Sequence, residues 1–142
     1  MCIVAQHSKR EFRSRFHEGR STLVMSSFNF QLNELCTEAG VSRVFLATDA
    51  PATEVKELSS LMRFPVIQYK NDELPDGAVA IVDQWICAHA RVFIGSHVST
   101  FSYRIQEDRE ILGFPPKTTF NRLCPDAEPK CEQPAKWTIV YS

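Results

Sequence analysis

Short apolar runs alternate along the chain with stretches in which apolar residues recur at helical spacing. The runs have the length of buried strands, and in chain order they are Cys2–Ala5, Val44–Ala47, Pro65–Tyr69 and Arg91–Gly95. Strands that alternate with helices are typical of a parallel sheet with helices on both faces. The pattern therefore predicts an α/β fold with a Rossmann-like parallel sheet layer.

The helical stretches show the spacing of helices that pack through one face. In chain order they are Leu32–Ala39, which Gly40 is expected to stop, Val55–Met62, Ala78–Ala90 and Ser99–Leu112. The third is apolar on most sides, so we expect it to be largely buried. The segment Phe12–Ser27 fits neither pattern and cannot be assigned to an element. The tail Gly113–Ser142 contains Pro and Cys and one strand-like piece, Trp137–Tyr141.

Length and composition favour a single soluble domain that spans residues 1–142. The chain is 44% hydrophobic and 23% charged, which is ordinary for one globular core. A net charge of −1 gives no field that would recruit nucleic acid or an anionic membrane, and no apolar run is long enough to span a bilayer. Met1–Gln6 lacks the features of a secretory signal, so the chain as written is expected in the cytoplasm.

Polar residues follow three of the predicted strands, and two of these ends are candidate sites because ligands of open parallel sheets bind beyond the carboxyl ends of the strands. His7 and Lys9 lie in a basic cluster after the first strand, which either neutralises a diphosphate leaving group or is a solvated loop. Ser99 and Thr100 begin the last helix, where N–H groups and the helix dipole favour a phosphate. Plain N-capping is the alternative for this pair. No GxGxxG or P-loop motif is present.

Two carboxylates are candidates for the chemistry of a site. Asp83 lies within the apolar third helix, where it either accepts the N1–H and N2–H₂ of a guanine or lies at the solvent edge. Asp108 stands four residues after Arg104 and could pair with it. Cys87 and His89 diverge on one helix, so we expect no zinc site there.

Four of the five cysteines divide into two kinds. Cys36 and Cys87 sit in apolar helical patterns and are expected to be buried thiols. Cys124 and Cys131 flank a polar loop, and a disulfide that closed it would stabilise the fold by roughly 2.5 kcal/mol. Such a bridge would indicate an oxidising compartment, and two free surface thiols are the alternative.

Many short segments of the chain together carry a resemblance to a known family. In chain order they are Val44–Ala50, Asp83–Arg91, Phe93–Gly95, Val98–Ser102, Arg109–Gly113, Pro116–Thr119, Asn121–Arg122, Cys124, Cys131–Pro134 and Trp137. From the second strand onward, the chain resembles the C-terminal half of GDP-fucose protein O-fucosyltransferases of the type that modifies thrombospondin repeats. The resemblance implies the C-terminal, nucleotide-binding domain of a GT-B glycosyltransferase. It also implies inverting transfer of fucose from GDP-fucose to Ser or Thr without a required metal or other cofactor.

The resemblance also assigns roles to individual positions. It implies that Asp83 reads guanine, that Thr100 and Phe101 contact the phosphate side, and that Cys124 and Cys131 form a disulfide. The family has a His-x-Arg element at the end of the first strand, whose Arg assists departure of the diphosphate. The matching residues here are His7, Ser8 and Lys9, with a Lys that keeps the charge but loses the bidentate fork. Asp108 stands where the family has a functionally important Glu.

The family's catalytic base, a Glu, belongs to an N-terminal domain. We therefore expect this chain to be a fragment without that domain and its base, unable to transfer fucose by itself. The resemblance implies the lumen of the endoplasmic reticulum as the compartment and folded thrombospondin-type repeats as acceptors. A stand-alone nucleotide-sugar-binding module without transferase activity is the second hypothesis, and a structural protein without a ligand is the third.

Overall fold

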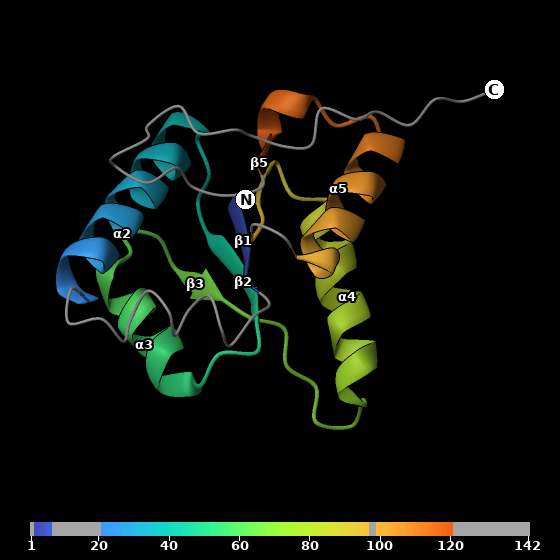
Figure 1. Cartoon of the computed structure of the whole chain (residues 1–142), viewed down its shortest axis with the longest axis horizontal. Helices are drawn as coiled ribbons and strands as arrows, with labels where there is room; N and C mark the ends of the chain where they lie inside the picture. The colour runs from blue at the N-terminus through green and yellow to red at the C-terminus, as the bar shows by residue number, and fades with distance from the viewer. Residues whose placement is uncertain (1, 7–20, 97–98, 121–142) are drawn as a thin grey trace.

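The computed structural model of the chain describes residues 2–6, 21–96 and 99–120 (Figure 1). Strands and helices alternate along the described residues. In chain order they are β1 (Cys2–Gln6), α2 (Ser21–Glu38), β2 (Val44–Thr48), α3 (Ala52–Leu61), β3 (Val66–Ile67), α4 (Asp76–Ala88), β4 (Val92–Ile94), α5 (Thr100–Ile111), the short 3-10 helix η1 (Pro116–Thr118) and β5 (Thr119–Phe120).

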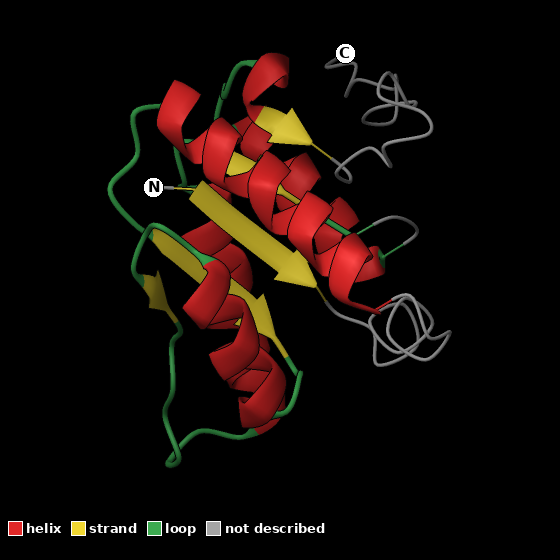
Figure 2. Cartoon of the chain, turned by 90° about the vertical axis from the view of Figure 1, so that its left-hand side faces the viewer, coloured by secondary structure: helices red, strands yellow, loops and turns green. Residues whose placement is uncertain are grey.

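The strands form one parallel sheet in the order β3-β2-β1-β4-β5. Figure 2 shows the longer strands side by side and pointing the same way. Val4 of β1 lies opposite Leu46 of β2 on one side and Ile94 of β4 on the other, so the carboxyl ends of these strands meet at one edge of the sheet. The prediction of a parallel α/β fold is confirmed.

Helices cover both faces of the sheet, with α2 and α3 on one face and α4 and α5 on the other (Figure 1). Successive residues of β2 point to opposite faces. The core beneath α2 and α3 is made by Leu32, Cys36, Val41, Val44, Leu46, Leu58 and Ile94. The core beneath α4 and α5 is made by Phe45, Ala47, Cys87, Ala88, Ala90, Phe93 and Ile105. Cys36 and Cys87 are buried thiols, as predicted.

The helix α2 begins earlier than the predicted helical stretch and ends where the sequence predicts. The helix begins at Ser21, so it includes the last seven residues of Phe12–Ser27, which the sequence pattern could not assign. Serines interrupt the apolar residues there and hide the helical period. At the other end Gly40 has a φ of 60°, and its amide donates to the carbonyl of Thr37 at 3.0 Å. Because glycine adopts this left-handed backbone without strain, Gly40 stops the helix as predicted.

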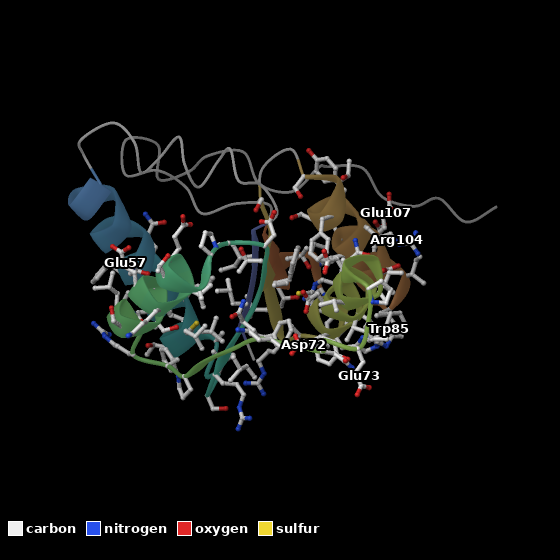
Figure 3. The ribbon with its side chains drawn as sticks, turned by 90° about the horizontal axis from the view of Figure 1, so that it is seen from below. Glu57, Asp72, Glu73, Trp85, Arg104 and Glu107 are labelled. Atoms are coloured by element: carbon white, nitrogen blue, oxygen red, sulfur yellow. The ribbon has the colours of Figure 1, made fainter. Side chains whose placement is uncertain are left out.

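The third predicted helix, α4, is less buried than its composition predicted. Its fully buried residues are Cys87 and Ala88 in the last turn, whereas Ile81 and Trp85 are 66% and 58% exposed. Figure 3 shows Trp85 on the outer side of α4, away from the sheet. The prediction of a largely buried helix was wrong because α4 meets the sheet mainly through its carboxyl-terminal part.

The two edge strands also differ from the prediction. β3 is only two residues long, and β5 pairs with β4 where the sequence predicted an irregular tail. Strands of two residues are too short for a periodic pattern to reveal. The strand-like piece Trp137–Tyr141 and the pair Cys124 and Cys131 lie outside the described residues. Among the helices that the structure describes, none combines the length and apolar character needed to cross a membrane.

Candidate functional site

The order of the strands marks one edge of the sheet as the place for a ligand. From β1 the chain passes to β2 and β3 on one side, and it then returns to β4 and β5 on the other side. In open parallel sheets, ligands bind outside the carboxyl ends of the strands where the order reverses in this way. The reversal lies between Gln6, which ends β1, and Ile94, which ends β4. His7 and Lys9 follow Gln6 in the sequence and lie outside the described residues.

The amino end of α5 lies at this edge, directly after β4. Ser99 is the N-cap of the helix, and its Oγ accepts a hydrogen bond from the backbone N–H of Ser102 at 3.4 Å. Its capping role is therefore confirmed. Thr100 is exposed in the first turn, and Phe101 is half-buried against the core beneath α4 and α5. The positive end of the helix dipole thus faces the reversal point of the sheet.

Asp83 carries an unpaired oxygen in its carboxyl group. Its Oδ1 is buried and accepts no hydrogen bond from the residues that the structure describes. Burial raises the pKa of the Asp83 carboxyl from 3.8 to about 6, so the group is mostly ionised at neutral pH. A buried acceptor without a donor costs about 1–3 kcal/mol, more when charged. Asp83 is therefore more than a carboxylate at the solvent edge of its helix.

A contact between the two helices places Asp83 beside the start of α5. The Nε2 of Gln84, the next residue along α4, donates to the backbone carbonyl of Phe101 at 3.5 Å. Gln84 is the ninth residue of α4 and Phe101 is the second of α5. The first two turns of α4 consequently extend past the start of α5 (Figure 1). Asp83 and the Ser99–Phe101 segment thus share the edge where the strand order reverses.

Asp108 lies away from this edge. It stands eight residues after Thr100, which is about 12 Å along the axis of a helix. Its Oδ1 pairs with the Nη2 of Arg104 at 3.2 Å, which confirms the predicted pairing, and Arg104 also reaches Glu107 at 3.7 Å. Figure 3 shows Arg104 and Glu107 on the outer side of α5. Among the predicted site residues described by the structure, Asp108 is the one that does not join the others.

Arg109 is a buried charge whose role the sequence analysis did not identify. It is 1% exposed at the opposite, amino edge of the sheet. The guanidinium donates from Nη1 to the carbonyls of Ala88 at 3.1 Å and Ala90 at 2.6 Å. It also donates from Nε to the Oγ1 of Thr119 at 2.8 Å, and from Nη2 to the carbonyl and Oγ1 of Thr118 at 3.1 and 2.9 Å. Arg109 therefore joins α4, α5, η1 and β5.

The charge of Arg109 persists in spite of its burial. Burial lowers the pKa of the guanidinium to about 10, which still leaves it protonated at neutral pH. The ring of Phe114 lies 4.4 Å from the guanidinium carbon and supplies a cation–π contact. Burial raises the pKa of the nearby Cys87 thiol, so that group stays neutral. Arg109 shares one face of α5 with Ser102 and Ile105, and because most of that face is polar, no sequence pattern signals its burial.

The described residues contain no group of three or more His, Cys, Asp or Glu side chains that could hold a metal ion. The groups gathered at the carboxyl edge are one carboxylate, two hydroxyls and the amino end of a helix. Such a set can accept hydrogen bonds from a base and donate them to a phosphate. The arrangement could therefore accept a base on α4 and a phosphate at the start of α5.

Known proteins resemble the chain over most of its length. A sequence model described as GDP-fucose protein O-fucosyltransferase matches residues 8–112. The chain is 58% identical over 113 residues to GDP-fucose protein O-fucosyltransferase 2 of Caenorhabditis elegans, covering 78% of this chain and 27% of the relative. It is 55% identical over 105 residues to the Homo sapiens protein of the same name, covering 71% and 24%. The chain spans about a quarter of the length of these curated relatives.

A solved structure agrees with the sequence comparison at the level of the fold. The crystal structure of POFUT1 in complex with GDP-fucose matches with a TM-score of 0.54 at 18% identity, covering 83% of this chain and 40% of that chain. This likeness concerns the fold alone, whereas the identity to the sequence relatives concerns individual residues. The family model covers most of the chain, and the two relatives are more than half identical to the matched part. The chain therefore belongs to the GDP-fucose protein O-fucosyltransferase family.

Proposed function

We propose that this chain is the GDP-fucose-binding part of a protein O-fucosyltransferase. The observation that carries the proposal is the unpaired, buried Oδ1 of Asp83 beside the amino end of α5. Guanine presents two adjacent donors, N1–H and N2–H₂, that one carboxylate can accept together. The helix end then faces the diphosphate. Membership in the family and the GDP-fucose complex of POFUT1 support the same ligand.

The finer description of the fold follows from the strand order. The order β3-β2-β1-β4-β5 corresponds to the first five strands of a dinucleotide-binding doubly wound sheet, which supports a Rossmann-like domain. We assign residues 1–142 to one such domain, the C-terminal domain of a GT-B glycosyltransferase. The likeness to POFUT1 over 40% of that chain supports this placement.

The phosphate side of the site belongs to the start of α5. Ser99 and Thr100 offer hydroxyls, and Phe101 packs its ring on the core so that the first turn is held against β2 and β4. His7 and Lys9 would add charge from the end of β1, which is the neighbour of β4. Lys9 would neutralise the diphosphate as a point charge. Asp108 would support the site at a distance, through its ion pair with Arg104 on α5.

The reaction that this site would serve is fucosyl transfer with inversion. The bond from fucose C1 to the β-phosphate oxygen breaks, and a bond from C1 to the acceptor hydroxyl oxygen forms. The acceptor proton passes to a carboxylate base. The bond electrons leave with GDP, whose charge the cations and the helix end stabilise. We place the base in a partner N-terminal domain and take a Ser or Thr of a thrombospondin-type repeat as acceptor, with no metal required.

The compartment and the tail belong to the same proposal. A transferase acting on disulfide-bonded repeats would work in the lumen of the endoplasmic reticulum, where a bridge between Cys124 and Cys131 would persist. Such a bridge would close an otherwise polar loop of the tail.

Calorimetry of the purified chain with GDP and ADP tests the proposal. We expect GDP to bind at least about tenfold more tightly, because adenine offers no adjacent donor pair for Asp83. Asp83→Ala should abolish the preference. Asp76→Asn is the matched control, since it alters an exposed carboxylate of the same helix. Equal affinity for the two nucleotides in the unaltered chain would refute the guanine site.

A further inference from the structure

One buried hydroxyl links the end of β4 to the start of α5. The Oγ of Ser102 accepts a hydrogen bond from the backbone N–H of Ser96 at 2.9 Å, and Ser102 is 2% exposed. The backbone N–H of the same residue donates to the Oγ of Ser99 at 3.4 Å. Ser102 therefore ties the exit of the strand to the cap of the helix from within the protein.

This arrangement differs from ordinary helix capping. In a capping box, the side chain at the third helical position bonds to the backbone N–H of the N-cap residue. Here the third position is Ser102, counted from the N-cap Ser99, and its hydroxyl reaches three residues further back to Ser96. The bond therefore fixes the helix to the strand, in addition to the cap that Ser99 supplies.

Close packing at Gly95 adds a second constraint. A Cβ built on Gly95 would lie 2.9 Å from the Cβ and 3.0 Å from the Oγ of Ser102, and 3.2 Å from the ring of Phe93. A side chain at Gly95 could therefore fit only if the first turn of α5 moved away from β4. The hydroxyl and the glycine together set the distance between the strand end and the helix end.

We propose that Ser102 is a positioning residue for the diphosphate, holding the Ser99–Phe101 segment at a fixed place beside the carboxyl end of β4. The inference rests on the proposed function. Ser102 does not touch the nucleotide, because it is buried behind the first turn of the helix. Its effect is expected on the phosphates alone, since Asp83, on a different helix, would hold the base. A preset phosphate site avoids the cost of ordering the start of α5 on binding.

Comparison of GDP with guanosine separates this role from general stability. Calorimetry on the full chain should show that Ser102→Ala weakens GDP about fivefold to twentyfold, while guanosine affinity changes less than about twofold. Gly95→Ala should give the same split by displacing the same turn. Ser60→Ala, which removes an exposed hydroxyl bonded to the carbonyl of Glu57, should change neither affinity.

A second variant keeps the test decisive if Ser102→Ala does not fold. Ser102→Cys retains a weak acceptor of similar shape. It should cause a smaller loss of GDP affinity, and the affinity for guanosine should again stay nearly unchanged. Equal losses for GDP and guanosine, or no loss for either, would overturn the positioning role and leave the guanine site intact. Failure of the unaltered chain to bind GDP would overturn both proposals.

Discussion

The layer formed by α4 and α5 holds a charged side chain at each end, and the two charges differ in their hydrogen-bond partners. At the amino edge of the sheet, Arg109 is fully buried and makes five hydrogen bonds to protein groups. At the carboxyl edge, Asp83 has a buried carboxyl oxygen that accepts no hydrogen bond from a described residue. Folding alone explains the first charge, because its partners are all present. The second is explained only if a donor arrives from outside the described structure.

The largest expected effect comes from removing the hydrogen bonds of Arg109. Arg109→Met should lower the free energy of unfolding by at least about 3 kcal/mol, because it removes the hydrogen bonds to the buried carbonyls of Ala88 and Ala90 and to the partly buried carbonyl of Thr118. Urea denaturation followed by circular dichroism measures the loss. Arg109→Lys should recover only part of it, since an ammonium lacks the planar fork. A loss below about 1 kcal/mol for Arg109→Met would show that the hydrogen bonds are not structural.

A smaller effect, on the affinity for GDP, is expected from protonating the carboxyl of Asp83. The pKa of Asp83 is raised from 3.8 to about 6, so the carboxyl is ionised at pH 7 and mostly protonated at pH 5. A protonated carboxyl cannot accept both guanine donors. The affinity for GDP should therefore fall about tenfold between pH 7 and pH 5 through this group, measured by calorimetry.

The nucleotide phosphates also titrate, so the background must be measured with a variant. Asp83→Asn should bind GDP more weakly than the unaltered chain at pH 7, and its own pH dependence belongs to the other groups. The tenfold fall is the difference between the two profiles. Parallel profiles for the two proteins would contradict a role for the Asp83 carboxylate in reading the base.

Some features of the fold and of the candidate site could be predicted from the sequence, and others could not. β2 was predictable because Val44–Ala47 are four consecutive apolar residues that are buried on both faces. Asp83 was identifiable because a carboxylate inside an apolar stretch needs a partner. The exposure of α4 could not be predicted, because composition does not reveal which part of the helix packs on the sheet. The apolar residues Ile81 and Trp85 read as core and lie at the surface.

The inner face of α5 was hidden for a different reason. Ser102, Gln106 and Arg109 are buried together with Ile105, so a mostly polar face points to the core. A hydrophobic period cannot detect such a face, because the pattern depends on apolar side chains. The hydrogen bond between Ser102 and Ser96 is equally invisible in sequence, since it depends on the course of the turn. Residues that hold a site in place are thus harder to predict than residues that contact a ligand.

The smallest expected effect comes from Arg104, an exposed arginine on the same helix as Arg109. Arg104 lies five residues before Arg109 on α5 and pairs with Asp108 and Glu107, but its side chain is 59% exposed. Arg104→Met should lower the free energy of unfolding by only about 0.2–1 kcal/mol, because water already solvates the guanidinium and screens the pairs. The same urea denaturation as for Arg109→Met measures it, and 1 M NaCl should shrink the difference further. Equal losses for Arg104→Met and Arg109→Met would mean that charge rather than burial decides how much an arginine of α5 stabilises the fold.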